Sequence, residues 1–153
     1  MIKETAAFHE VKWIPDEHLL YTRVTGLYNH NHVDAWEQAL RTQAKKIPDN
    51  STFKFIIDEA GYQFENIDVH KYKREVIPRF LAHYGLVLSL LTDEDKKLLR
   101  QSVSLNNHNI QCIAVAMSHH DTLKMQQIQA TSGTENEGYF SDYSQAYQWI
   151  MNV

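Results

Sequence analysis

The stretch CIAVAM at residues 112–117 is apolar at every position and lacks the alternation that marks a half-exposed strand. It is followed directly by the polar, turn-like stretch SHHD at 118–121. A short unbroken apolar run of this kind predicts a strand covered on both faces, as in the centre of a parallel sheet. Residues 112–117 therefore place the chain in the α/β class.

The residues after this strand continue a strand–helix alternation. A helix is expected to begin at His120 or Asp121, to run to about Thr131 and to end at Gly133. Residues 137–140 predict a last short strand. A C-terminal helix capped by Asp142 is then indicated by the spacing of its apolar residues, Tyr143, Ala146, Tyr147 and Ile150.

The chain opens with two β-like runs, at residues 8–14 and 19–25. Between them, Pro15-Asp16-Glu17-His18 places proline where a type I turn needs its fixed φ, which predicts an antiparallel hairpin. Residues 26–29 are expected to end the second strand.

Two helical patterns and a strand lie between this hairpin and the central strand. The first helix is predicted over about 31–46, with Asn31 as its N-cap and Pro48 as its stop. Residues 53–58 form the next strand. The second pattern contains Pro78, which predicts a kink or a restart, and its apolar positions are Val69, Tyr72, Val76, Phe80 and Tyr84.

Residues 85–110 are expected to form an inserted helical segment. The sequence TDED at 92–95 is similar to a capping box and predicts a short helix through Leu98, Leu99 and Val103, before a polar loop from Leu105 to Asn109. The whole order is β-β-α-β-α-(α)-β-α-β-α. It predicts one domain of 153 residues with a mixed, mostly parallel sheet and an N-terminal β-hairpin.

Composition narrows the classes of function. Fifteen basic and nineteen acidic residues give a net charge of −4, which argues against nucleic-acid binding. The basic cluster at 70–74 is interpreted as a solvated helix face. A single cysteine, Cys112, excludes an internal disulfide and is expected to be a buried, inert thiol. No signal-peptide-like N-terminus and no apolar run of membrane-spanning length is present, so the predicted location is the cytoplasm.

Three stretches appear in an order that resembles a known family. They are LYTRVTG at 20–26, followed by Asn29-His30 and a helix; FIID at 55–58, followed by Gln63-Phe64 and a helix; and residues 112–118 with the tail YFSD at 139–142, running to Ala146 and Trp149-Ile150. Together they resemble the STAS domain of bacterial anti-sigma factor antagonists, in its SpoIIAA-like branch. The resemblance covers most of residues 19–84 and 111–151.

This resemblance implies a non-catalytic regulatory or protein-interaction module that binds a protein partner or a second copy of itself as a homodimer. The antagonists of this family carry a phospho-acceptor signature where this chain has ENIDV at 65–69, without serine or threonine. A phosphate switch is therefore expected to be absent. Asp68 takes roughly the acceptor position, where it imitates a negative charge or, in the favoured interpretation, serves as a helix N-cap or first-turn acid.

Similarity to the CRAL-TRIO lipid-binding domains implies the alternative function, a carrier or sensor of a small apolar ligand in a cavity under the inserted helices. Leu86 and Leu88, with Leu90-Leu91, then form a lid over that cavity, a self-association patch, or simple core packing. The aromatic residues near the second helix line such a cavity or belong to the core; they are Tyr62, Phe64, Tyr72, Phe80 and Tyr84.

A third hypothesis is a weak hydrolase or metal site. Asp58 and Glu59 follow one predicted parallel strand, and His119 and His120 follow another, so all four are expected at the same edge of the sheet. Adjacent histidines do not easily direct both rings at one ion, and no catalytic or metal-binding motif is present. The sequence therefore assigns no catalytic residue, metal or cofactor. The candidate partner- or ligand-binding residues are Asp58, Glu59, Tyr62, Phe64, Asp68, Tyr72, Leu86, Leu88, His119 and His120.

Overall fold

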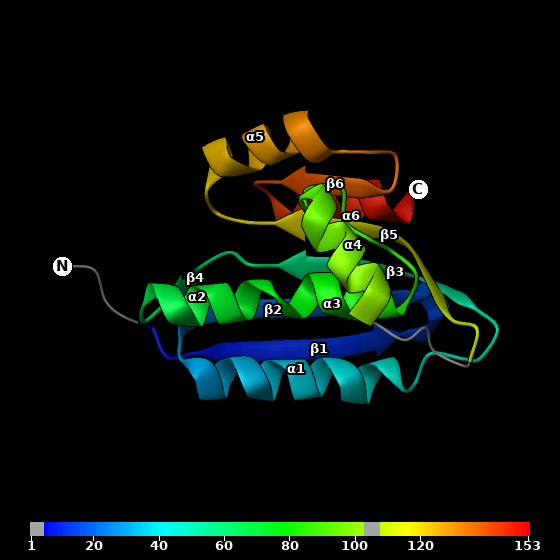
Figure 1. Cartoon of the computed structure of the whole chain (residues 1–153), viewed down its shortest axis with the longest axis horizontal. Helices are drawn as coiled ribbons and strands as arrows, with labels where there is room; N and C mark the ends of the chain where they lie inside the picture. The colour runs from blue at the N-terminus through cyan, green and yellow to red at the C-terminus, as the bar shows by residue number, and fades with distance from the viewer. Residues whose placement is uncertain (1–4, 103–107) are drawn as a thin grey trace.

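A six-stranded, mostly parallel sheet forms the centre of the structure, a computed structural model that describes residues 5–102 and 108–153 (Figure 1). The main path of the sheet is β1-β2-β3-β5-β6, and β4 pairs with the far end of β2. Among the strand pairs of the described residues, only β1–β2 is antiparallel. The strands are β1 (Phe8–Ile14), β2 (Leu19–Tyr28), β3 (Thr52–Asp58), β4 (Tyr62–Phe64), β5 (Gln111–Ser118) and β6 (Glu137–Phe140).

Helices cover both faces of this sheet, and the hydrophobic cores on the two faces differ in size. The larger core lies between one face and α1 to α3, and the smaller core lies under α6 on the other face. Because β2, β3, β5 and β6 follow one another across the sheet, the helices that connect them gather on one side (Figure 1). The helices are α1 (His30–Ala44), α2 (Ile67–Arg74), α3 (Val76–His83), α4 (Asp93–Ser102), α5 (Thr122–Ser132) and α6 (Tyr143–Met151).

The central strand and its neighbours agree with the sequence pattern. β5 lies between β3 and β6 and is parallel to both. Asp121 caps α5, because its carboxylate accepts a hydrogen bond from the Lys124 N–H at 3.0 Å. Gly133 is the C-cap of the same helix. None of the described helices has the length and apolar character needed to cross a membrane.

The expected break in the second helical pattern and the expected cap of the inserted helix are both present. The second helical pattern breaks at Glu75, and Pro78 lies in the first turn of α3. Thr92 caps α4, since its Oγ1 accepts a hydrogen bond from the Asp95 N–H at 3.1 Å. Val103 and the first part of the predicted polar loop, residues 105–107, lie outside the described residues.

The strand β2 ends within residues 26–29, as expected, but it is longer than the predicted run of 19–25. The strand continues to Tyr28 and pairs there with β4, a strand that the sequence pattern did not reveal. Gly26 allows this continuation, because its φ of +86° suits glycine and a Cβ there would lie 2.1 Å from the Ala6 carbonyl oxygen.

The predicted start of the first helix is wrong, by one or two residues. The N-cap of α1 is Asn29 and not Asn31. The Asn29 side chain accepts a hydrogen bond from the His32 N–H at 3.0 Å, and His32 Nδ1 accepts one from the Asn29 N–H at 3.1 Å. A histidine thus completes this reciprocal cap in place of the usual Glu or Gln.

Candidate functional site

A cleft of about 760 Å³ is lined by residues of α2, α3, α4 and α5. Met117 of β5 contributes to its wall, and α4 contributes one whole helical face. Its volume lies within the usual range for small-molecule sites. The aliphatic residues that line the cleft are Ile77, Leu88, Leu90, Leu91, Leu98, Leu99, Met117, Met125 and Ile128.

The α4 face of the cleft follows from helical spacing. Asp95, Leu98, Leu99 and Ser102 line the cleft, and their spacing of i, i+3, i+4 and i+7 puts them on one side of the helix. None of the ten residues of α4 is buried, and the Leu98 side chain is 55% exposed. The helix therefore holds an apolar face over the cleft that the protein core does not cover.

A buried ion pair lies at the polar end of this cleft. Glu59 directly follows β3, and its N–H donates a hydrogen bond to the Ser118 carbonyl oxygen of β5 at 2.7 Å. Its carboxylate binds the Lys73 ammonium of α2, and both side chains are less than 8% exposed. Burial alone would raise the pKa of Glu59, but the charge and hydrogen bond of Lys73, together with the charges of His119 and Lys124, outweigh burial and lower that pKa.

Tyr62 of β4 supplies an unpartnered hydroxyl at the same end. The Lys73 ammonium lies 4.4 Å from the centroid of the Tyr62 ring, a cation–π contact. The residue is 5% exposed, and its hydroxyl has no hydrogen-bond partner among the described residues. Burial raises the pKa of Tyr62, so the hydroxyl keeps its proton, and this buried donor is unsatisfied among the described residues.

His119 also lines this end, and its ring stacks on that of His120, which lies outside the cleft, with ring centroids 4.1 Å apart. His119 Nδ1 accepts a hydrogen bond from the Asp121 N–H at 2.9 Å, and His120 Nδ1 accepts one from the Gly61 N–H at 3.1 Å. Burial lowers the pKa of His119 to about 4. At neutral pH its ring is therefore uncharged, and the single ring proton lies on Nε2 because Nδ1 is an acceptor.

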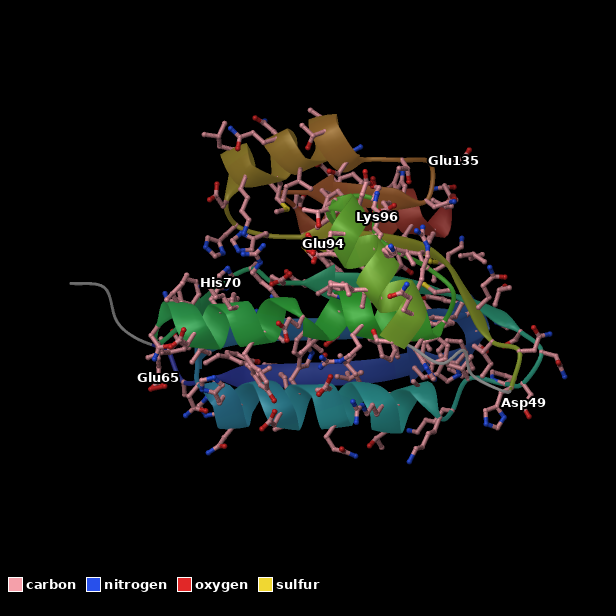
Figure 2. All side chains as sticks on the ribbon, in the orientation of Figure 1. Asp49, Glu65, His70, Glu94, Lys96 and Glu135 are labelled. Atoms are coloured by element: carbon pink, nitrogen blue, oxygen red, sulfur yellow. The ribbon has the colours of Figure 1, made fainter. Side chains whose placement is uncertain are left out.

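His70 of α2 is a further cleft residue. In Figure 2 it lies on the side of α2 that faces the connection between β5 and α5. Its ring stacks on Phe64 with centroids 4.3 Å apart, and its buried Nδ1 has no partner among the described residues. Burial also lowers the pKa of His70, which favours its neutral form.

The structure brings four of the predicted site residues together and separates the others. Glu59, Tyr62, Leu88 and His119 line the cleft. Asp58 does not, because consecutive residues at the end of a strand point to opposite faces. Its Oδ1 accepts hydrogen bonds from the Ala60 N–H at 3.0 Å and the Ser118 hydroxyl at 3.2 Å. The predicted residues outside the cleft are Asp58, Phe64, Asp68, Tyr72, Leu86 and His120.

Those outside the cleft have structural surroundings of their own. Asp68 is exposed in the first turn of α2, whose N-cap is Asn66, not Asp68. Tyr72 donates a hydrogen bond to the Asp34 carboxylate. Leu86 packs against the larger core, as do the two aromatic residues Phe80 and Tyr84.

Sequence reasoning missed Lys73, His70 and Lys124, which also line the cleft. The interpretation of residues 70–74 as a solvated face is wrong for Lys73, which is 6% exposed. A signal was present, because Val69, Lys73 and Ile77 are spaced four apart and lie on one stripe of buried positions. Lys124 and its neighbours on α5 carried no comparable signal, since that helix has only one buried residue, Met125.

Metal and thiol chemistry find little support at this edge. Among the described residues, no group of three or more His, Cys, Asp or Glu side chains is arranged to hold a metal ion. The Nδ1 atoms of His119 and His120 are already occupied by backbone amides. Cys112 is buried inside β5, and burial raises its pKa to about 12.

Comparison with known proteins gives no relative. No protein-family model matches the sequence, and neither a curated protein nor a solved structure matches it.

Proposed function

We propose that this protein binds a small, largely apolar molecule in the cleft beneath α4, as a carrier or sensor of that molecule. The observation that carries the proposal is the cleft itself, about 760 Å³ in volume and lined by nine leucine, isoleucine and methionine side chains together with polar and charged residues of α2 to α5. Apolar walls with a few polar groups are the usual composition of a small-molecule site.

The exposed leucines distinguish this cleft from ordinary core packing. Leu98 is 55% exposed and Leu90 is 39% exposed, although both line the cleft. Covering a leucine side chain completely stabilises a complex by roughly 1.5–3 kcal/mol. An aliphatic ligand gains this free energy, which the folded chain by itself leaves unused.

The regulatory-module hypothesis stays a prediction, as do the STAS-like identity of the fold and a cytoplasmic, bacterial setting. One residue that was proposed for its self-association patch is buried. Leu88, a candidate for a self-association patch, is 4% exposed and lies in the wall of the cleft. A leucine in this position supports a ligand site better than a surface contact.

Acid–base catalysis is the weaker alternative for the polar end. A general base works best with a pKa near the working pH. The Glu59 carboxylate is bound by Lys73, and the pKa of His119 is about 4, so at neutral pH neither is poised to exchange a proton. These groups therefore suit the fixed recognition of a ligand.

The test is a titration with dodecanol, a neutral aliphatic probe, followed by NMR of the leucine and methionine methyl groups. We expect shifts at Met117, Met125 and Leu99. The variant Leu98→Asp places a charge in the cleft and should weaken binding by about tenfold to a hundredfold, because a leucine contact is worth roughly 1.5–3 kcal/mol.

The matched control is Leu123→Asp. Leu123 is also an exposed leucine, at 65%, but it lies in the first turn of α5 and does not line the cleft. It should bind dodecanol like the unmodified protein. An absence of methyl shifts, or an equal loss of affinity in both variants, would refute the proposed function.

A further inference from the structure

The polar end of the cleft presents hydrogen-bond donors. The Tyr62 hydroxyl is buried, protonated and without a partner among the described residues. His119 offers its Nε2 proton, because its Nδ1 is held by the Asp121 N–H. A ligand group that satisfies these donors must itself be an acceptor.

The charge at this end is positive once the buried pair is accounted for. Glu59 is the acid whose charge acts on both Tyr62 and His119, and the Lys73 ammonium already compensates its carboxylate. Lys124, on the first turn of α5, lines the cleft and forms no ion pair with a described residue. Its charge acts on His119, His70 and Glu59, which places it close to all three.

We propose, on the basis of the proposed function, that the ligand is an aliphatic molecule with an oxyanion head group, held by the Tyr62 hydroxyl, His119 Nε2 and Lys124 Nζ. Its aliphatic chain runs from this end along Met125 and Leu99 beneath α4. A carboxylate and a phosphate monoester share the required chemistry, since both are anionic and offer only acceptors to these donors. An ammonium head would leave the Tyr62 and His119 donors unsatisfied and would be repelled by Lys124.

The experiment is isothermal titration calorimetry of the full chain at pH 7 with four probes that share one alkyl chain: dodecanoate, dodecyl phosphate, dodecanol and dodecylamine. A charge-assisted hydrogen bond stabilises a complex by an amount that corresponds to about tenfold to a hundredfold in affinity. We therefore expect at least one of the two anions to bind about tenfold or more tightly than dodecanol, and dodecylamine to bind most weakly. The tighter of the two anions identifies the head group.

Two variants assign the effect to this end of the cleft. Lys124→Gln and Tyr62→Phe should each weaken binding of the anion by about tenfold and weaken dodecanol binding by less, because the uncharged alcohol forms no charge-assisted hydrogen bond. Lys97→Gln is the control, because Lys97 is an exposed lysine of α4 that does not line the cleft. It should bind all four probes like the unmodified protein.

The outcomes separate the two proposals. If none of the four probes binds, the proposed function itself fails. If dodecanol or dodecylamine binds as tightly as both anions, the cleft is an apolar site without an oxyanion subsite and this inference is overturned. Equal losses for the anion and the alcohol in Lys124→Gln would overturn it as well, because the residue would then act on the shape of the cleft and not on the head group.

Discussion

Replacing one member of the Glu59–Lys73 pair provides a quantitative test of the structure at the polar end. Both side chains are less than 8% exposed, and each charge has the other as its partner. Glu59→Leu leaves the Lys73 ammonium buried without its carboxylate, and Lys73→Met leaves the carboxylate buried without its cation. The double variant removes both charges and replaces them with apolar side chains.

The magnitudes follow from this burial. Breaking a buried pair by removing one partner costs about 3–5 kcal/mol, whereas replacing both members by apolar groups is often neutral or stabilising. For a chain of 153 residues, each kcal/mol corresponds to roughly 2–4 °C in Tm. Each single variant should therefore melt about 6–20 °C below the unmodified protein, and the double variant should recover most of that loss.

The assay is chemical denaturation of all four proteins, followed by circular dichroism, with calorimetric Tm values beside it. The free energies of unfolding form a double-mutant cycle, and the coupling between the two residues should exceed about 2 kcal/mol. Single variants that each lose less than about 1 kcal/mol would refute the buried pair. Additive losses in the double variant would refute it equally.

Three further predictions concern neighbouring groups. Tyr62→Phe removes a buried hydroxyl that has no partner among the described residues, so the ligand-free protein should gain about 1 kcal/mol of stability; a lower Tm would contradict this. Because the pKa of His119 falls from 6.5 in the unfolded chain to about 4 in the fold, the folded state binds fewer protons between these values, and stability should decline as pH falls through that window. His119→Gln should flatten this part of the denaturation profile, and an unchanged slope would contradict the assignment. Gly26→Ala should destabilise the fold by more than Gly85→Ala, since both have positive φ but only the Cβ at residue 26 meets backbone, at 2.1 Å; equal Tm losses would contradict the close approach.

Local pattern predicted most of the elements. The unbroken apolar run at 112–117 identified the central strand, because a strand covered on both faces has mostly apolar side chains; Ile113 is the exception and is 38% exposed. Sequence pattern predicted the start of α5 at His120 or Asp121 and the cap of α6 at Asp142; the Asp121 and Asp142 carboxylates each accept a hydrogen bond from a backbone N–H. These signals lie within a few residues of the features that they determine.

The features that pattern did not predict depend on contacts between distant parts of the chain. The extension of β2 past Gly26 is stabilised by β4, a strand of three residues that is too short to show a periodicity. The burial of Lys73 depends on Glu59, fourteen residues earlier. The spacing of Lys73 from Val69 indicates a buried position, whereas its charge predicted an exposed one.

The same dependence on contacts between distant parts of the chain explains why the candidate site was predicted only in part. The carboxyl ends of β3 and β5 were expected at one edge, and the Glu59 N–H does bind the Ser118 carbonyl oxygen there. Adjacent residues nevertheless divide between the two faces, so Glu59 and His119 enter the cleft whereas Asp58 and His120 do not. That division depends on the last residues of each strand, which the sequence pattern does not fix to within one position.

Native mass spectrometry of the full chain, purified without detergent and then mixed with an excess of dodecanoate, tests the central claim most directly. If the ligand site lies beneath α4, we expect a single adduct of one dodecanoate per chain. This adduct should be lost in Leu98→Asp and kept in Leu123→Asp. A bare protein mass at every probe concentration, or adducts that are equally abundant in both variants, would contradict a ligand site beneath α4.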